Sequence, residues 1–239
     1  PGLYIEIRNQ RQYLFPLEFS HLLGYEGKVA EAEMEVKSKQ GYLLNDYLGK
    51  TGLELSYEQI LRGKYGEDIV EIDVAGQEKK VLSHLDPQNG QNLVLTIDQK
   101  VQAKAREILV NDLKRFNKSK ASLIMINPQN GEILALISYP DFDNNLFSGG
   151  ISSDDYKTLI DNPNQPLFDR ALKGEYPSGS VIKMAVAAGA LQDKLITDRT
   201  SFMSTGGLML NDRWFFPDWA AGGHGATNVY KAIAWSVNT

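Results

Sequence analysis

The sequence contains no cysteine and only three histidines among its 239 residues. The absence of cysteine excludes disulfide bonds and thiolate metal sites, and it leaves the cellular compartment open. No apolar run approaches the roughly 18–20 residues that a membrane-spanning helix needs, and no signal peptide is visible. No block of like charges accompanies the net charge of −5, which argues against a nucleic-acid partner.

What is present is the composition of a globular protein, with 42% hydrophobic and 23% charged residues. This composition excludes a mainly disordered or low-complexity chain. A length of 239 residues allows one large domain or two small ones. The chain begins at Pro1 without a methionine and stops at Thr239 without a polar tail, so we expect both ends to continue in a longer protein.

The first 88 residues are punctuated by glycine and mix two kinds of pattern. Alternation of apolar and polar residues predicts strands, and longer periodic runs predict helices. The expected elements are strands over 3–8 and 68–74 and helices over 30–40 and 55–64. The turn-rich stretch 84–92 predicts a junction, and we therefore expect one domain over 1–88 and a second over 89–239.

The second domain opens with a predicted strand over 93–97 that leads into a helix capped near Asp98. One stripe of this helix is apolar and consists of Val101, Ala105, Ile108, Leu109, Leu113 and Phe116. Residues 121–140 then read as a β-hairpin with a Pro/Asn/Gly turn. This order predicts an α+β fold, an antiparallel sheet covered by helices.

Ser180 and Lys183 form the only Ser-x-x-Lys pair in the chain. Residues three apart share a helix face, so the Ser180 hydroxyl and the Lys183 amine can meet at the first helical turn. A helix N-terminus supplies N–H groups suited to an oxyanion, and a lysine kept neutral by desolvation can act as a base. The alternative is that Ser180 only caps an ordinary helix, a common role of serine.

A second pair, Ser236 and Asn238, stands at the end of a predicted helix over 228–235. Ser-x-Asn is a weak pattern alone, and residues 152–154 match it nearly as well. Its weight comes from order, because Ser-x-x-Lys, Ser-Asp-Asn and Lys-Thr-Gly together mark penicillin-binding proteins and β-lactamases. The Lys-Thr-Gly at 50–52 lies upstream, so we interpret it as unrelated and expect the third motif beyond Thr239.

Longer segments extend this resemblance over nearly the whole chain. They are FSHLLGYEGKV (19–29), YLGKTGLELSYEQILRGKYG (47–66), LTIDQKVQ (95–102), NPQNGEILALISYPDFDNN (127–145), DRALKGEYPSGSVIK (169–183) and GGHGATNVYKAIAWSVNT (222–239). They resemble class B penicillin-binding proteins, most of all the penicillin-binding protein 2 group of elongation D,D-transpeptidases. The resemblance implies a pedestal, or dimerisation, domain over 1–88. It also implies a penicillin-binding/serine β-lactamase-like transpeptidase domain over 89–239, truncated after its second motif.

The resemblance also implies roles for individual residues. Ser180 would be the acylated nucleophile, and Lys183 the base that takes its proton. Ser236 would relay a proton to the leaving D-alanine, and Asn238 would hold the amide of the peptide. The Ser180 N–H would supply half of the oxyanion hole, with the other half on the strand of the third motif. No cofactor is implied.

Some members of the group hold a zinc ion near the second motif through Asp, His and Cys. Here Asp218 and His224 are kept, but Val237 stands where the cysteine would. Two ligands are too few for a closed tetrahedral site, so we expect no metal and interpret His224 as a hydrogen-bonded histidine beside a glycine turn. His21 and His84 carry no signal beyond turn or surface positions. Trp214, Trp219 and Trp235 are interpreted as packing residues.

The resemblance implies a peptidoglycan D,D-transpeptidase that cross-links stem peptides, is a target of β-lactam antibiotics and meets elongation proteins through the pedestal. It implies the extracytoplasmic face of the bacterial inner membrane, with an N-terminal anchor outside this sequence. Residues 1–239 alone are expected to be inactive. Two alternatives stay open: a β-lactam hydrolase or sensor with the same serine chemistry, and a non-catalytic interaction fragment.

Overall fold

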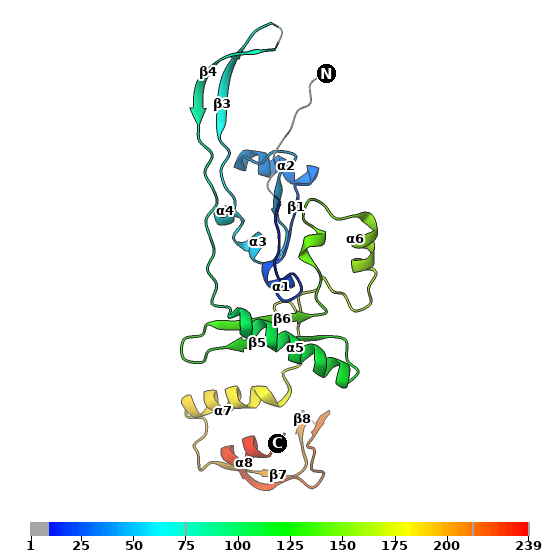
Figure 1. The fold of residues 1–239 in the computed structure, drawn as a ribbon. Helices are drawn as coiled ribbons and strands as arrows, with labels where there is room; N and C mark the ends of the chain where they lie inside the picture. Colours follow the sequence, from blue (N-terminus) through cyan, green and yellow to red (C-terminus); the bar gives the residue numbers. More distant parts are fainter. Residues whose placement is uncertain (1–9, 75, 212, 239) are drawn as a thin grey trace. The chain divides into compact units, whose positions relative to one another are not determined.

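The computed structural model describes residues 10–74, 76–211 and 213–238, in two compact units over 1–174 and 175–239 (Figure 1). The strand expected over 3–8 lies outside the described residues. Every sheet in the described part of the chain consists of two antiparallel strands. Helices and antiparallel hairpins alternate along both units, which confirms the α+β class. None of the helices in these described segments has both the length and the apolar character to cross a membrane.

Short helices and paired strands follow one another along the first unit. Its helices are α1 (Ser20–Leu23), α2 (Glu31–Lys37), η1 (Ser38–Gln40), α3 (Gly52–Ser56), α4 (Glu58–Leu61), α5 (Gln99–Arg115), η2 (Asn144–Leu146) and α6 (Ser153–Ile160). Its strands are β1 (Glu26–Lys28), β2 (Tyr47–Gly49), β3 (Glu67–Ile72), β4 (Glu78–Leu85), β5 (Ala121–Ile126) and β6 (Ile133–Tyr139).

A small core forms beside the β1–β2 pair. Val29, Tyr42 and Leu48 are buried there, and Met34 of α2 packs against them. The helices expected over 30–40 and 55–64 are confirmed, although each is divided into two short pieces. Short helices of this length gain most of their stability from such packing rather than from helix propensity.

The β3–β4 hairpin confirms the strand expected at 68–74. Its apolar side chains are exposed, including Ile69, Val81 and Leu85, so this hairpin adds little to the core of the first unit. Beyond the ends of the hairpin strands, Lys64 and Gln88 form an isolated antiparallel β-bridge. The chain then runs through the turn-rich segment toward α5.

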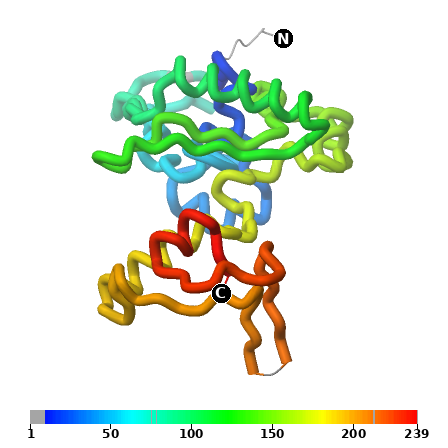
Figure 2. The backbone as a smooth tube through the Cα atoms, turned by 90° about the horizontal axis from the view of Figure 1, so that it is seen from below, coloured from blue at the N-terminus to red at the C-terminus, as the bar shows by residue number. Residues whose placement is uncertain are grey.

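The helix α5 packs on the β5–β6 hairpin and forms the second core of this unit. Figure 2 shows α5 lying along the two strands. The Asp98 side chain accepts hydrogen bonds from the N–H groups of Lys100 and Val101, which confirms the predicted cap. The core residues are Ala105, Ala135 and Ile137, with Val101, Leu109 and Leu123 packed against them.

Two details of this region differ from the sequence-based expectation. Ile108 and Phe116 belong to the predicted apolar stripe but are exposed, because a two-stranded hairpin covers only part of the helix surface. The strand expected over 93–97 is also wrong. Instead of strand pairing, the Thr96 hydroxyl donates to the Ile133 carbonyl of β6, and the N–H of Asp98, just after the segment, donates to the Leu134 carbonyl.

His21 is buried, contrary to the expected turn or surface position. Its Nδ1 lies 3.1 Å from the Ser20 hydroxyl and its Nε2 lies 2.7 Å from the Pro166 carbonyl oxygen. The ring meets Phe142 edge to face, with centroids 5.2 Å apart. Burial lowers the pKa of His21, so the neutral imidazole is the form that the fold favours.

The described residues of the second unit form two α-helices, a short 3₁₀ turn and two antiparallel strand pairs. Its elements are η3 (Gly179–Val181), α7 (Ile182–Gln192), β7 (Ser201–Ser204), β8 (Gly207–Leu210), β9 (Trp214–Pro217), β10 (Gly225–Asn228) and α8 (Val229–Ala234). The strand β10 pairs with β7, and β8 pairs with β9. Figure 2 shows the β8–β9 hairpin extending away from the rest of this unit. The predicted helix over 228–235 is confirmed as α8, capped by the Asn228 side chain.

Candidate active site

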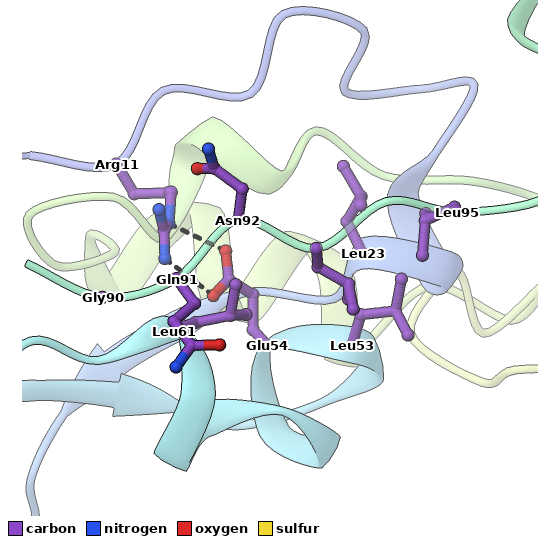
Figure 3. A pocket seen from close by; sticks show the side chains of 10 residues that line it. Arg11, Leu23, Leu53, Glu54, Leu61, Gly90, Gln91, Asn92 and Leu95 are labelled. Atoms are coloured by element: carbon purple, nitrogen blue, oxygen red, sulfur yellow. Dashed lines mark hydrogen bonds and ion pairs between the residues drawn. The ribbon is translucent and has the colours of Figure 1, made fainter.

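A cavity of about 490 Å³ lies in the first unit (Figure 3). Arg11 and Glu54 form a two-point ion pair on its wall, with N–O distances of 2.8 and 3.0 Å. The remaining lining consists of leucines and the segment that contains Gly90. Among the described residues that line this cavity there is no serine, threonine, lysine or histidine, and the carboxylate of Glu54 is paired. It therefore offers no nucleophile and no free base.

Ser180 and Lys183 stand at the start of α7 in the second unit. Ser180 lies in the single 3₁₀ turn η3, and Lys183 is the second residue of α7. Gly179 just before the serine has a φ of +55°, a left-handed conformation that glycine adopts without a steric penalty. The N-cap residues of η3 and α7 are Ser178 and Val181, and neither side chain makes a capping hydrogen bond. Ser180 lies between these two cap residues, so the alternative that it only caps the helix gains no support from them.

All four predicted site residues meet at this point of the second unit. Lys183 Nζ donates to the Ser236 carbonyl oxygen at 2.7 Å, to Ser236 Oγ at 3.2 Å and to Asn238 Oδ1 at 2.6 Å. Ser236 Oγ in turn donates to Ser180 Oγ at 2.6 Å. Among the hydrogen bonds of the described residues, Ser236 therefore stands between the serine and the lysine of the first pair.

The turn that carries Ser236 is a helix C-terminal motif. The N–H of Ser236 donates to the Ile233 carbonyl at 3.2 Å, and the N–H of Val237 donates to the Ala232 carbonyl at 2.9 Å. This is the Schellman pattern, in which the residue after the C-cap adopts a left-handed conformation. Ser236 has a φ of +51°, whereas glycine is the usual residue there. The backbone of the turn thus carries strain at a residue whose hydroxyl is used.

Lys183 also lines an apolar cavity of about 180 Å³, whose other walls come mainly from α7 and α8. Its walls are Val186, Ala187, Val229, Ala232, Ile233 and Val237. Lys183 is half-buried in this arrangement. Lys183 thus has polar acceptors for its amine and apolar neighbours along the cavity, while Ser180 stays exposed.

Asp218 is bonded to the Ser236–Asn238 turn, a link that the sequence motifs do not reveal. Its Oδ2 accepts a hydrogen bond from the N–H of Asn238 at 2.7 Å. Its Oδ1 accepts from the N–H of Ala220 at 3.3 Å and lies 3.2 Å from His224 Nε2. The hydrogen bond from Asn238, followed by those from Ala220 and His224, lowers the pKa of Asp218 despite the opposing effect of burial.

His224 makes the hydrogen bonds expected of a histidine beside a glycine turn. Its ring lies between Trp219 and Trp235, with centroid distances of 4.9 and 5.6 Å. The indole N–H of Trp219 donates to the Trp235 carbonyl at 2.9 Å. Gly223 has a φ of +73°, and a Cβ there would lie 2.2 Å from the Ser204 carbonyl oxygen, so only glycine fits this turn. The tryptophan side chains are mostly exposed.

The residues here do not fit the zinc site of some class B penicillin-binding proteins. Asp218 and His224 hydrogen bond to one another, and Val237, at the position of the cysteine, presents a buried apolar side chain. A tetrahedral zinc site needs four donors of nitrogen, sulfur or oxygen type. Within the described ranges, no group of three or more His, Cys, Asp or Glu residues is placed to hold a metal ion.

The hydrogen bonds of two residues of the site were not predicted from the sequence, although Asp218 was named there as part of an incomplete metal site. Asp218 is 20 residues from Asn238, and no spacing rule connects them. Lys231 on α8 donates to the carbonyls of His224 and Ala226 at 2.5 and 3.1 Å, and it looks like a surface lysine in the sequence. The sequence feature that points to Asp218 is its pairing with His224 in the segments 218–219 and 222–225. In the sequence this pair resembles only an incomplete metal site.

Two family profiles match most of the chain. Residues 1–95 match the penicillin-binding protein dimerisation domain, and residues 121–239 match the penicillin binding protein transpeptidase domain. The chain is 37% identical over 240 residues to the peptidoglycan D,D-transpeptidase MrdA of Acinetobacter baumannii. It is 34% identical over 244 residues to the MrdA of Escherichia coli K12. All of this chain is covered in both comparisons, but only 35% and 37% of the relatives.

Solved structures give the same result for the fold. The chain superposes on penicillin-binding protein 2 in its complex with MreC from Helicobacter pylori with a TM-score of 0.81 and 32% identity, covering 95% of this chain and 41% of the other. It superposes on penicillin-binding protein 2 of Pseudomonas aeruginosa, in complex with WCK 5153, with a TM-score of 0.72 and 29% identity, covering 95% and 45%. The chain thus spans about a third of the length of its curated relatives and less than half of these structures.

Proposed function

Because the chain belongs to the penicillin-binding proteins, we propose that it is part of a peptidoglycan D,D-transpeptidase that works through a Ser180 acyl-enzyme. The observation that carries the proposal is the continuous contact from Ser180 Oγ through Ser236 Oγ to Lys183 Nζ. A nucleophile, a relay and an amine in one chain of hydrogen bonds are the components of serine acyl transfer.

In the first half-reaction, Ser180 Oγ attacks the carbonyl carbon of the terminal peptide bond of a stem peptide. The Ser180 proton passes to Lys183, which in this geometry is reached through Ser236 Oγ. The backbone N–H of Ser180 donates to the oxyanion that forms. The carbon–nitrogen bond then breaks, the leaving D-alanine takes a proton through Ser236, and an ester to Ser180 remains.

In the second half-reaction, the amine of another stem peptide attacks this ester. A new amide forms, and the Ser180 hydroxyl is restored with the proton that the attacking amine loses. Asn238 holds the backbone amide of the peptide. The arrangement supplies the lysine with three acceptors, which match the three N–H groups of an ammonium, so the base role requires Lys183 to lose one proton first.

A β-lactam would acylate Ser180 in the same way, by opening of its ring amide. Hydrolysis of that adduct needs a base that activates water. In the described part of the chain, the carboxylate bonded to the site is Asp218, and its oxygens are occupied by Asn238, Ala220 and His224. This observation favours a transferase over the alternative of a β-lactam hydrolase.

We also propose a division into a pedestal over 1–88 and a transpeptidase domain over 89–239. The compact units instead divide after Gly174, because polar contacts connect the two segments within the first unit. Gln102 Nε2 donates to the Glu18 carbonyl at 2.6 Å, and Asn144 Nδ2 donates to the Ser20 carbonyl at 2.9 Å. The pedestal would then be fixed to the start of the transpeptidase domain.

We propose that the pedestal contacts proteins of the cell-wall elongation machinery, and that the whole protein acts at the extracytoplasmic face of the bacterial inner membrane, anchored by an N-terminal helix. The support is a relative: penicillin-binding protein 2 of Helicobacter pylori forms a complex with MreC. Deletion of 67–85, the β3–β4 hairpin, in the full-length protein tests whether its exposed apolar residues take part.

The catalytic proposal is tested by labelling the full-length protein with a fluorescent penicillin. We expect a covalent adduct in the wild type and none in Ser180→Ala, because the nucleophile is absent. Ser178→Ala is the matched control, since it removes a neighbouring hydroxyl that makes no capping hydrogen bond. Labelling of Ser180→Ala at the wild-type level would overturn the assignment, and rapid turnover of the drug would favour a hydrolase.

A further inference from the structure

We propose that Asp218 is the positioning residue for the Ser236–Asn238 turn, and that it acts by direct hydrogen bonds without a metal ion. The inference rests on the proposed function, because it concerns how the relay and the substrate amide are held. Asp218 directly follows β9, and its side chain is fully buried within the second unit. Among the hydrogen bonds of the described residues, those of Asp218 go to Asn238, Ala220 and His224 rather than to Ser180 or Lys183, so its effect is exerted through the turn.

The contact between Asp218 and Asn238 fixes the main chain of the turn. Asn238 N–H donates to Asp218 Oδ2 at 2.7 Å, and a charged acceptor makes this hydrogen bond stronger than a neutral one. The neighbouring Pro217 carbonyl accepts from Asn238 Nδ2 at 3.2 Å. With its amide nitrogen held there, Asn238 directs Oδ1 toward Lys183.

His224 holds the other oxygen of Asp218 and is itself fixed from two elements. The N–H of His224 donates to Ser204 Oγ of β7 at 3.1 Å, and its carbonyl accepts from Lys231 of α8. The His224 side chain is only 3% exposed and that of Asp218 is 0% exposed. A buried carboxylate with partners on both oxygens has little freedom to rotate, so it can fix the position of the Asn238 backbone nitrogen.

This network takes the place that a metal ion would hold. Ser236 has a strained, left-handed backbone conformation. A serine keeps this conformation only where its surroundings hold it there, and the hydrogen bonds of Asp218 are part of those surroundings. Hydrogen bonds on both sides of the turn, to α8 before it and to Asp218 after it, supply that restraint. Without Asp218, the Ser236 hydroxyl and the Asn238 amide would lose their alignment with Ser180 and Lys183.

The experiment measures the rate of acylation of the full-length protein by a fluorescent penicillin, in Asp218→Ala, Asp218→Asn and the exposed control Asp198→Ala. We expect Asp218→Ala to be slower by roughly 10- to 100-fold, because displacements of about 1 Å at a catalytic group have effects of that size. Asp218→Asn keeps an acceptor for Asn238 but loses the charge and turns an NH2 group toward the Ala220 N–H, so its rate should fall between those of Asp218→Ala and the wild type. Asp198→Ala should match the wild type.

A double-mutant comparison separates positioning from simple loss of stability. In a Ser236→Ala background, Asp218→Ala should slow acylation by only about threefold or less, because the hydroxyl that it aligns is already gone and coupled sites are not additive. Equal effects in both backgrounds would overturn the inference, as would a wild-type rate in Asp218→Ala. If Ser180→Ala still labels, the proposed function fails instead, whatever Asp218→Ala does.

The absence of a metal ion from the network has its own test. Treatment of the wild-type protein with a zinc chelator should leave the acylation rate and the melting temperature unchanged, and elemental analysis should find no zinc in stoichiometric amount. Loss of acylation on chelation, with recovery on addition of zinc alone, would show that a metal rather than a direct hydrogen bond holds the turn.

Discussion

The two units use polar side chains in different ways. In the first unit, Gln102 and Asn144 are fully buried, and their hydrogen bonds go to the main chain. In the second unit, Lys183, Ser236 and Ser180 bond to one another, and the last of them stays exposed. Side chains that hydrogen bond to the main chain, as in the first unit, hold the fold together. The side-chain hydrogen bonds of the second unit instead leave the Ser180 hydroxyl oxygen accessible for reaction.

The largest expected effect concerns the base. Lys183→Arg keeps a positive charge and the hydrogen-bond donors, but a guanidinium does not lose its proton near neutral pH. If Lys183 is the base, we expect acylation by penicillin in the full-length protein to fall by about 1000-fold or more. Lys194→Arg is the matched control, because that lysine is exposed. Acylation in Lys183→Arg at nearly the wild-type rate would mean that the lysine only supplies charge.

The next effect tests the first unit. Gln102 Oε1 accepts from the N–H of Leu136, and its Nε2 donates to the Leu136 carbonyl, each at 2.8 Å. Gln102→Ala leaves both groups buried without partners, so the free energy of unfolding should fall by about 2–4 kcal/mol. Urea unfolding measures this change. The control Gln129→Ala, at an exposed position, should have the unfolding free energy of the wild type. An equal loss of unfolding free energy in both variants would show that the buried hydrogen bonds of Gln102 are not its cause.

A smaller effect distinguishes stability from function at Ser236. Glycine adopts the left-handed conformation more readily than serine, so Ser236→Gly should raise the free energy of unfolding by up to about 1 kcal/mol. The same variant lacks the relay hydroxyl and should acylate more slowly. Thermal unfolding and acylation rates on one preparation measure both. If Ser236→Gly is less stable than the wild type and acylates at the same rate, then serine neither strains the turn nor acts as the relay.

The smallest effects are two opposite pH dependences in the first unit. Burial lowers the pKa of His21, so the unfolded chain binds the proton better, and stability should be lost as pH falls below about 6.5. Hydrogen bonds to Asp68 and then Asp86 raise the pKa of His84. The contribution of His84 is therefore complete below about pH 6.5 and is lost as pH rises through the raised pKa.

Comparison of His21→Gln and His84→Gln with the wild type between pH 5 and 8 measures both dependences. The difference in unfolding free energy should change with pH in opposite directions for the two variants, and the effect of the exposed His84 should be the weaker one. Parallel curves would show that burial of His21 does not govern its protonation.

The elements with strong local signals were predicted well from the sequence. The Asp98 cap and the hairpin over 121–140 depend on neighbouring residues only, and so does the helix before Ser236. The strand at 93–97 failed because a strand exists only through a partner, and a short apolar run alone does not provide one. His21 failed for a related reason, since Pro166 and Phe142, which bury it, are far away in the sequence.

The same distinction applies to the site. Ser180, Lys183, Ser236 and Asn238 were identified because family motifs name them, and their hydrogen bonds now bring them together. The position of Ser236 between Ser180 and Lys183 was not predicted, because spacing along α7 suggests a direct contact. The restraint by Asp218 was also missed, since it depends on how the chain returns after β9.

Peptide mass spectrometry after reaction of the full-length protein with penicillin shows directly which residue becomes acylated. We predict that the mass of the intact drug is added to the peptide that contains Ser180, and that the peptide with Ser236 is unmodified. An adduct on Ser236 or on any other residue, with Ser180 unmodified, would contradict the account.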